Sequence, residues 1–246
     1  MIVSRIALGK PAAYGQEIVK RRFRLTAATV TLSGKTVLDF GCGNGAQTCE
    51  FAPAGGKIFA VDLALADLQI LRRQLDRERV ASIVPIQYDG AHLPIASNAL
   101  DLVVSFDVLE HVHDEAAVLR EWHRALKPDG EIVLSVPNKG WIFETHGANL
   151  PGLPWHRVPF LSYLPHGLHR RLARARIYRR RDIVRLLRAH AFEILRTQYI
   201  TAPLDVLPNG RLKRLLQTCF FRSDTTRLSM LATAIFVHAR KISAPY

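Results

Sequence analysis

The apolar residues of this chain follow two alternating spacings. Short, nearly continuous apolar runs are typical of strands buried on both faces of a parallel sheet, and they alternate with segments of helical spacing. The predicted strands span 37–40, 57–61, 82–87, 99–106, 131–136, 192–199 and 228–238. The predicted helices span 47–51, 64–79, 114–127 and 181–190, after a lead-in helix that begins near Ala12. This order predicts an α/β, Rossmann-like, doubly wound sheet of seven strands, mainly parallel.

The first predicted strand runs into a glycine-rich turn, KTVLDFGCGNGAQT at 35–48. Asp39 stands near the carboxyl end of the strand, and glycines alternate in the turn at Gly41, Gly43 and Gly45. Glycines remove the side chains that would keep a ligand away from the backbone. The turn between strand and helix therefore predicts a cradle for a small molecule.

Four carboxylates follow four successive predicted strands. Asp39, Asp62, Asp89 and Asp107 each stand at the exit of a strand. In a doubly wound sheet, ligands bind outside the carboxyl ends of the strands. Because an ionised carboxylate only accepts hydrogen bonds, this row suits a ligand that carries an ammonium, a ribose and an exocyclic amine.

With these motifs, the first 140 residues resemble a class I S-adenosylmethionine-dependent methyltransferase of the small-molecule type that includes ubiquinone, lipid and glycan O-methyltransferases. The matching motifs are VLDFGCGNG at 37–45, the pair at 61–62, DGA at 89–91 before LPIASNALD, and ALKPDGEIVLSVPN at 125–138. A nicotinamide-binding dehydrogenase is the main alternative. Its G-x-G-x-x-G spacing fails here because Ala46 stands where the last glycine would be.

The resemblance implies S-adenosyl-L-methionine as the cofactor and assigns residues to it. The turn would hold the methionine part through its backbone, with Asp39 as support, and Asp62 would bind both ribose hydroxyls. Leu63 would pack on the adenine, and Asp89 would accept a hydrogen bond from the adenine amine. The full set of implied cofactor residues is Asp39, Gly41, Cys42, Gly43, Gly45, Asp62, Leu63, Asp89, Gly90, Ala91, Phe106 and Asp107.

Candidate catalytic residues follow the fourth predicted strand, in FDVLEHVHD at 106–114. Methyl transfer mainly needs alignment and exclusion of water, and a base is needed only for a protonated acceptor. We predict Glu110 and His111 as catalytic, since histidine can take a proton near neutral pH. Asp107, Glu110 and His111 also resemble the metal ligands of ubiquinone-type O-methyltransferases, but Asp replaces the family's first Glu, which leaves a divalent metal as the less favoured alternative. The alternative is that Glu110 and His111 only shape the pocket wall.

The composition changes after Pro137. Aromatic residues among prolines, followed by a cluster of His and Arg, predict a basic, aromatic lid at 138–177, and a second basic excursion covers 201–227. We predict a single domain over 1–246, with the cofactor-binding core at 30–137 and the C-terminal part of the sheet at 178–246. The lid's aromatic residues are Trp141, Phe143, Trp155, Phe160 and Tyr163.

The net charge of +13 lies entirely in the last part of the chain. Residues 1–140 hold 16 Lys/Arg and 16 Asp/Glu, whereas residues 141–246 hold 18 and 5. An excess of one sign implies an anionic partner. With the interfacial aromatic residues, it favours a small-molecule or lipid-type acceptor and peripheral contact with an anionic membrane.

Other interpretations stay open for this region. The lid's aromatic residues could form a small local core, with the arginines merely solvated. An RNA methyltransferase is less favoured, because the chain has neither an N/D-P-P-aromatic motif after the fourth strand nor a Pro-Cys pair. A cofactor-binding membrane-surface protein without turnover is the alternative outside enzymes.

The three cysteines favour a reducing compartment, because their number is odd and they show no metal-ligand spacing. No signal-like start or span-length apolar run is present, and we expect a cytoplasmic protein. The sequence leaves the acceptor and the oligomeric state open.

Overall fold

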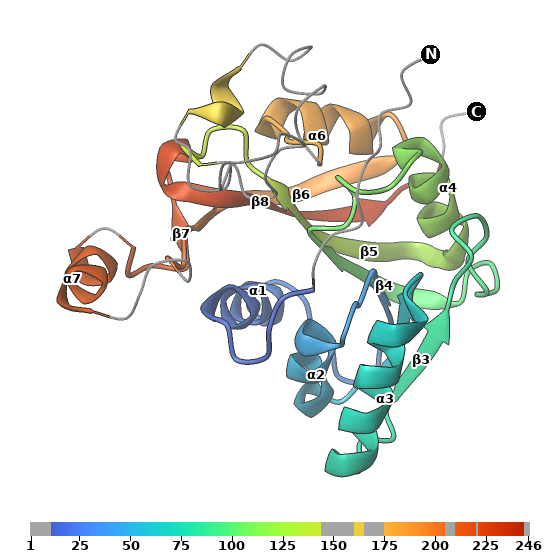
Figure 1. The fold of residues 1–246 in the computed structure, drawn as a ribbon. Coiled ribbons are helices and arrows are strands. Elements are labelled where there is room, and N and C mark those ends of the chain that lie inside the picture. Colours follow the sequence, from blue (N-terminus) through green and yellow to red (C-terminus); the bar gives the residue numbers. More distant parts are fainter. Residues whose placement is uncertain (1–10, 144–159, 165–174, 205–209, 220, 244–246) are drawn as a thin grey trace, which may run out of the picture.

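The computed structural model describes residues 11–143, 160–164, 175–204, 210–219 and 221–243. Within these residues the strands form one eight-stranded sheet in the order β3-β2-β1-β4-β5-β8-β6-β7 (Figure 1). The strands are β1 (Thr36–Phe40), β2 (Lys57–Asp62), β3 (Ile83–Gln87), β4 (Leu100–Phe106), β5 (Leu126–Pro137), β6 (Phe192–Thr201), β7 (Thr225–Thr226) and β8 (Ala232–Lys241). The first five pair in parallel and the last three pair antiparallel, which confirms the predicted α/β architecture.

The sheet of the described residues has one strand more than the seven predicted. The additional strand, β7, holds only Thr225 and Thr226, which pair with Ile200 and Tyr199 of β6. Two residues carry no recognisable periodicity, so the apolar pattern could not reveal this strand. It lies in the basic excursion predicted at 201–227.

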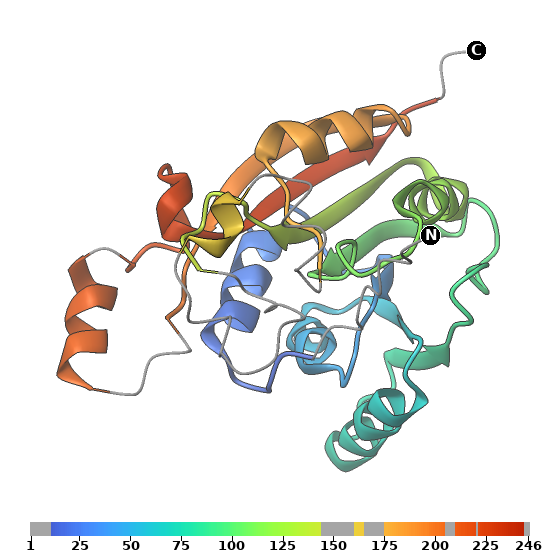
Figure 2. The same cartoon turned by 45° about the horizontal axis from the view of Figure 1, so that its top comes forward.

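Helices cover both faces of the sheet (Figure 2). One apolar cluster joins the sheet to α1, α2 and α3, and a second joins the opposite face to α4 and α6. The helices are α1 (Glu17–Ala27), α2 (Ala46–Phe51), α3 (Leu65–Glu78), α4 (Glu115–Ala125), α6 (Arg180–Arg188) and α7 (Arg211–Cys219), with short 3-10 turns η1 (Ala52–Ala54), η3 (Leu161–Tyr163) and η4 (Ser229–Leu231). The sheet is therefore the middle layer of three.

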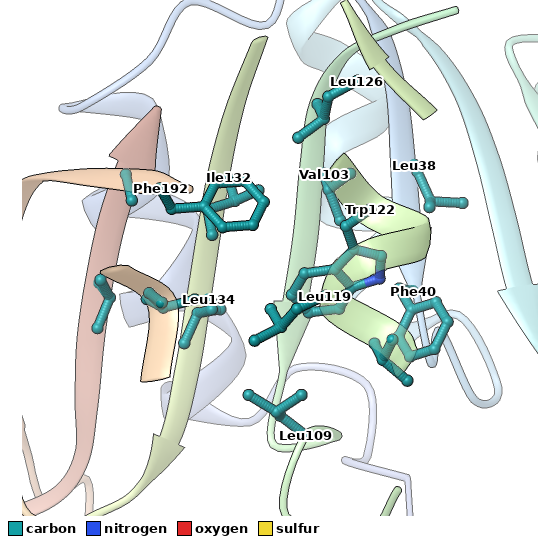
Figure 3. Close-up of a cluster of buried hydrophobic side chains, with 14 of the residues drawn as sticks. Leu38, Phe40, Val103, Leu109, Leu119, Trp122, Leu126, Ile132, Leu134 and Phe192 are labelled. Atoms are coloured by element: carbon teal, nitrogen blue, oxygen red, sulfur yellow. The ribbon is translucent and has the colours of Figure 1, made fainter. Parts of the chain in front are cut away.

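Residues of β1 point alternately to the two faces, as the pleat of a strand requires. Leu38 and Phe40 join the cluster under α4 and α6, whereas Val37 joins the cluster under α1 to α3. Trp122 of α4 is fully buried in the cluster under α4 and α6, and the centre of its ring lies 5.3 Å from that of Phe40 (Figure 3). This packing holds the carboxyl end of β1 rigidly, and that end leads into the glycine turn.

The ends of several elements differ from the prediction: α1 begins at Glu17 rather than near Ala12, and β5 begins at Leu126 rather than at 131. Helix α4 begins at the predicted place, where Oδ1 of Asp114 accepts hydrogen bonds from the backbone N–H groups of Ala116 and Ala117. It ends at Ala125, earlier than predicted, because β5 begins at once at Leu126. Strand β8 begins later than predicted, because η4 occupies 229–231.

Helix α1 connects the start of the chain to the stretch after β6. Arg21 is buried, and its guanidinium donates to the carbonyl oxygens of Thr201 at 2.8 Å and Phe221 at 2.7 Å. On the exposed side, Arg24 forms an ion pair with Asp224 at 2.6 Å. The amino-terminal helix is thus fixed to a part of the chain that follows it by about 200 residues.

Most of the predicted lid at 138–177 lies outside the described residues, namely 144–159, which includes Trp155, and 165–174. In the described part, Trp141 is 7 % exposed and contacts the ring of Phe143. Phe160 and Tyr163 are 63 % and 51 % exposed. No helix in the described ranges is long and apolar enough to cross a bilayer.

Candidate functional site

A cavity of about 1630 Å³ opens at the carboxyl edge of the parallel strands. Its wall includes the last residues of β1, β2 and β4, and on the far side it includes residues that follow β5 and β6. Sites for small molecules usually measure about 300–1,000 Å³. The cavity therefore has room for a cofactor and a second molecule together.

The glycine turn forms one wall of this cavity. Gly41 and Gly43 line it, whereas Gly45 lies behind the wall at the start of α2. A Cβ atom on Gly41 would lie 2.4 Å from Cγ2 of Val108, and one on Gly45 would lie 2.2 Å from Cδ1 of Leu71. Both residues also have positive φ angles, which favour glycine. At these two positions the packing of the protein itself requires glycine, which adds to the predicted reason of ligand access.

Asp62, the last residue of β2, is fixed by the backbone on both sides. Its Oδ2 accepts a hydrogen bond from Gly43 N at 2.7 Å, and its Oδ1 accepts one from Ala64 N at 2.9 Å. Cys42 also lines the cavity, and its N–H donates to the carbonyl of Val61 at 3.1 Å. A carboxylate has about four acceptor positions, so Asp62 keeps capacity for hydrogen bonds to a molecule in the cavity.

Asp39 lies at the base of the turn and is only 2 % exposed. Its Oδ2 accepts a hydrogen bond from the hydroxyl of Thr48 at 2.6 Å. Burial, assisted by the nearby Asp62 carboxylate, raises the pKa of Asp39 to about 7, although the Thr48 hydrogen bond acts in the opposite direction. Asp39 thus links β1 to α2 beneath the turn.

The predicted adenine residues are divided between the wall and the surface. Leu63, Gly90 and Ala91 line the cavity, and Leu63 is 42 % exposed. Asp89 is exposed and does not line the cavity, and its Oδ1 accepts hydrogen bonds from Ala91 N at 2.8 Å and His92 N at 3.2 Å. These hydrogen bonds lower the pKa of Asp89. In this structure the Asp89 carboxylate shapes its own turn.

Asp107 forms an ion pair that sequence reasoning missed. Its carboxylate accepts hydrogen bonds from Arg22 of α1 and, at 3.0 Å, from the hydroxyl of Ser135. The guanidinium carbon of Arg22 lies 5.6 Å from the ring centre of Phe106, and Arg22, Phe106 and Asp107 all line the cavity. Helical spacing could have indicated that Arg22 shares a face of α1 with Ile18, because the two are one turn apart, and both line the cavity.

The two predicted catalytic residues lie in different environments. His111 lines the cavity, although only 8 % of its side chain is exposed. Glu110 does not line it and is fully buried, with Oε1 at 4.0 Å from Nε2 of His111. Burial, followed by the nearby Asp107 carboxylate, raises the pKa of Glu110 well above its usual range. Only His111 of this pair can contact a bound molecule.

Asp107, Glu110 and His111 do not form a metal site in this structure. Among the described residues, no group of three or more His, Cys, Asp or Glu side chains is arranged to hold a metal ion. The Asp107 carboxylate already has Arg22 as its cationic partner, and the Glu110 carboxyl lies behind the wall. The residues present therefore do not fit the ligand set that the resemblance suggested.

The opposite end of the cavity is apolar. Trp141 and Phe143 line it from the segment after β5, and Ala202, Pro203 and Leu204 line it from the segment after β6. Trp141, Ala202 and Leu204 also belong to a separate small cluster of buried apolar residues. This cluster agrees in part with the interpretation that the aromatic residues after Pro137 form a local core.

The lead-in segment before α1 forms part of the cavity wall. Pro11, Ala12 and Gln16 line the cavity. The hydroxyl of Tyr14 donates to the carbonyl of Asn44 at 2.6 Å, which ties the segment to the glycine turn. The turn is therefore held between α1 and the sheet.

Residues 38–134 match a family model described as a methyltransferase domain. The ubiquinone biosynthesis O-methyltransferase of Pseudomonas paraeruginosa is 33 % identical over 153 residues, which cover 56 % of this chain and 57 % of the relative. The chain thus spans a little more than half the length of the curated relatives that it matches.

Solved structures match over a larger share of the chain. An S-adenosylmethionine-dependent methyltransferase from Mesorhizobium loti aligns with a TM-score of 0.61 at 19 % identity, covering 89 % of this chain and 96 % of that chain. The [4+2]-cyclase SpnF aligns with a TM-score of 0.62 at 17 % identity, covering 96 % and 89 %. At such identities the likeness shows the fold, which the two proteins share despite their different names.

Proposed function

We propose that this chain is a class I S-adenosylmethionine-dependent methyltransferase and that it methylates an oxygen atom of a small-molecule, lipid-linked or glycan-type acceptor. The observation that carries this proposal is the cavity itself. It brings the glycine turn, Asp62 and His111 to one space whose other end is apolar. The related O-methyltransferases of ubiquinone biosynthesis support oxygen as the acceptor atom.

The residues that line the cavity support an assignment of each part of the cofactor. Asp62 holds the ribose hydroxyls with its remaining acceptor positions, and Leu63 and Ala91 contact the adenine. The backbone of the turn at 41–43 and the Arg22–Asp107 pair hold the methionine end, because a guanidinium beside a carboxylate complements a zwitterionic amino acid. When bound, S-adenosylmethionine supplies a methyl group that its sulfonium already activates.

The chain's own contribution to the reaction is alignment, exclusion of water and movement of one proton. With the cofactor bound, His111 would accept the proton of the acceptor hydroxyl while its oxygen takes the methyl group and the sulfonium leaves as a neutral thioether. Glu110 has no access to the cavity, so its role is to position His111 from behind. Trp141 and Phe143 exclude water from the acceptor end.

The acceptor is proposed to be at least partly apolar. The residues at that end are Trp141, Phe143, Ala202, Pro203 and Leu204. Exposed Phe160 and Tyr163, together with the basic charge of residues 141–246, support peripheral contact with an anionic membrane. The same charge would also attract RNA, which makes RNA an outcome to be tested.

The first experiment tests methyl transfer. The purified chain is incubated with S-adenosylmethionine labelled in its methyl group and with an extract of small molecules and lipids. We expect one labelled lipid or small-molecule product. If the chain binds S-adenosylhomocysteine but labels nothing, the non-catalytic alternative is correct, and if it labels RNA, the acceptor assignment is wrong.

The second experiment tests the membrane contact. Flotation with vesicles that contain an anionic phospholipid is compared with a salt-dependent RNA shift. We expect flotation that falls when Phe160 and Tyr163 are both changed to Ser. Ile70→Ser is the control, because Ile70 is an exposed apolar residue on α3. Retained RNA binding without flotation would overturn the lipid assignment.

A further inference from the structure

The loop that carries His111 has little secondary structure of its own. Residues 107–114 connect β4 to α4, and within this loop His111 N donates to the carbonyl of Val108 at 2.8 Å. No strand or helix ladder fixes the carbonyl groups at 110, 112 and 113. Any protein donors to these carbonyl groups therefore come from outside a regular ladder.

A single residue, Arg176, donates to all three of these carbonyl groups. Its backbone N–H donates to the carbonyl of Glu110 at 3.2 Å. Its guanidinium donates to the carbonyl of Val112 through Nη1 and to that of His113 through Nη2 at 3.0 Å. His111 lies between the residues so held, and its side chain lines the cavity.

The guanidinium of Arg176 is itself held in place. Its Nε lies 3.6 Å from Oε2 of Glu115, and the hydroxyl of Tyr178 donates to Oε1 of the same carboxylate at 2.6 Å. Glu115 is the first residue of α4, so the loop and the start of the helix are joined to Arg176 together. A guanidinium presents its donors in a fixed fork, which one ammonium cannot reproduce.

The segment around Arg176 is anchored to the sheet. Tyr178 N donates to the carbonyl of Pro137 at 3.0 Å, and Lys139 N donates to the carbonyl of Tyr178 at 2.8 Å. The side chains of Ile177 and Tyr178 are buried. Arg176 is thus a rigid support rather than a mobile surface arginine.

We infer that Arg176 is a positioning residue for His111: it fixes the loop at 110–113 and thereby the direction in which the imidazole faces the acceptor. The inference rests on the proposed function in one respect, namely that His111 is the group that meets the acceptor. Arg176 itself does not line the cavity and takes no part in binding the cofactor. A displacement of the imidazole by about 1 Å can lower the rate of a reaction by roughly a hundredfold.

The test measures the imidazole directly, so it needs no acceptor. The full chain is labelled on histidine, and the His111 ring signal is assigned by its loss in His111→Gln. We compare Arg176→Ala and Arg176→Lys with Arg124→Ala. Arg124 is a matched control, because it also donates to two loop carbonyls, at Leu93 and Ile95, and pairs with a carboxylate, at Glu121.

We expect a large shift or broadening of the His111 signal in Arg176→Ala, a smaller one in Arg176→Lys, and none in Arg124→Ala. S-adenosylhomocysteine, measured by calorimetry, should bind Arg176→Ala within about twofold of the unmodified affinity. An unmoved His111 signal in Arg176→Ala, or an equal shift in Arg124→Ala, would overturn the inference. If Arg176→Ala does not fold, the comparison uses Arg176→Lys, and an unmoved His111 signal in that variant would overturn the inference.

The two measurements separate this inference from the proposed function. If S-adenosylhomocysteine fails to bind the unmodified chain while Arg176→Ala still moves the His111 signal, the methyltransferase proposal falls and the positioning role stands. If S-adenosylhomocysteine binds and the His111 signal stays unmoved, the positioning role falls alone.

Discussion

The two ends of the cavity are built in different ways. The cofactor end comes largely from short loops directly after β1, β2, β3 and β4, and the Asp62 carboxylate accepts backbone hydrogen bonds from the loops after β1 and β2. The acceptor end comes from segments after β5 and β6 that meet only in the folded chain. The first end is thus defined by local sequence and is recognisable as a motif. The second depends on contacts between segments that are distant in the sequence.

The largest effect that separates the two ends is expected for His111→Ala. Without the imidazole, methyl transfer to the labelled product should fall by about 10²–10⁴-fold, the range for loss of a general base. The affinity for S-adenosylhomocysteine, measured by calorimetry, should hardly change. An equal loss of affinity would place His111 at the cofactor end, and the two ends of the cavity would then not differ in function as proposed.

Asp62→Ala should give the reverse result. Each charge-assisted hydrogen bond lost to the ribose is worth about 1.5–3 kcal/mol, so affinity for S-adenosylhomocysteine should fall by roughly 10- to 150-fold per bond. The N–H groups of Gly43 and Ala64 also lose their acceptor. Unchanged affinity in calorimetry would refute the ribose assignment.

Asp39→Asn tests the support beneath the turn through pH. Because the folded pKa of Asp39, about 7, lies above its ordinary value of 3.8, the folded state holds a proton between these values that the unfolded state releases. Asp39 therefore lowers stability as pH rises from about 4 to about 7, with a slope of at most about 1.4 kcal/mol per pH unit. Urea unfolding at several pH values should show this slope reduced in Asp39→Asn. An identical slope in both proteins would mean that Asp39 titrates normally.

The smallest effect is expected for Asp89→Ala. The Asp89 carboxylate is exposed and already accepts two hydrogen bonds within its own turn. Affinity for S-adenosylhomocysteine should therefore fall by less than in Asp62→Ala, in the same calorimetric assay. A loss as large as that of Asp62→Ala would show that Asp89 turns toward the adenine amine when the cofactor binds.

The sequence indicated that the glycine turn, Asp39, Asp62 and Asp107 lie at one edge of the sheet, because strand periodicity locates the carboxyl end of each strand. It could not predict which carboxylate side chains face the cavity. The outward position of Asp89 and the burial of Glu110 are therefore known only from the structure. The sequence did not predict Arg22 and Arg176 either. Their partners lie 85 and about 64 residues away, and no local pattern encodes such pairs.

Predictions for the acceptor end were less specific for the same physical reason. Trp141 was recognised as an aromatic residue after Pro137, but its packing against Ala202 and Leu204 depends on the position of β6. The two-residue strand β7 was missed because it is defined by pairing with β6 rather than by its own residues.

The hydrogen bonds of Arg21 have a consequence for how the chain folds. Arg21 lies near the amino terminus, and its acceptors at Thr201 and Phe221 follow it by 180 and 200 residues. Contacts between positions so far apart require the closure of a long loop and tend to form slowly. During synthesis α1 emerges well before Thr201 and Phe221, so it can make these hydrogen bonds only after both residues have been made. The hydrogen bonds that fix the helix carrying Arg22 therefore depend on a part of the chain made about 200 residues later.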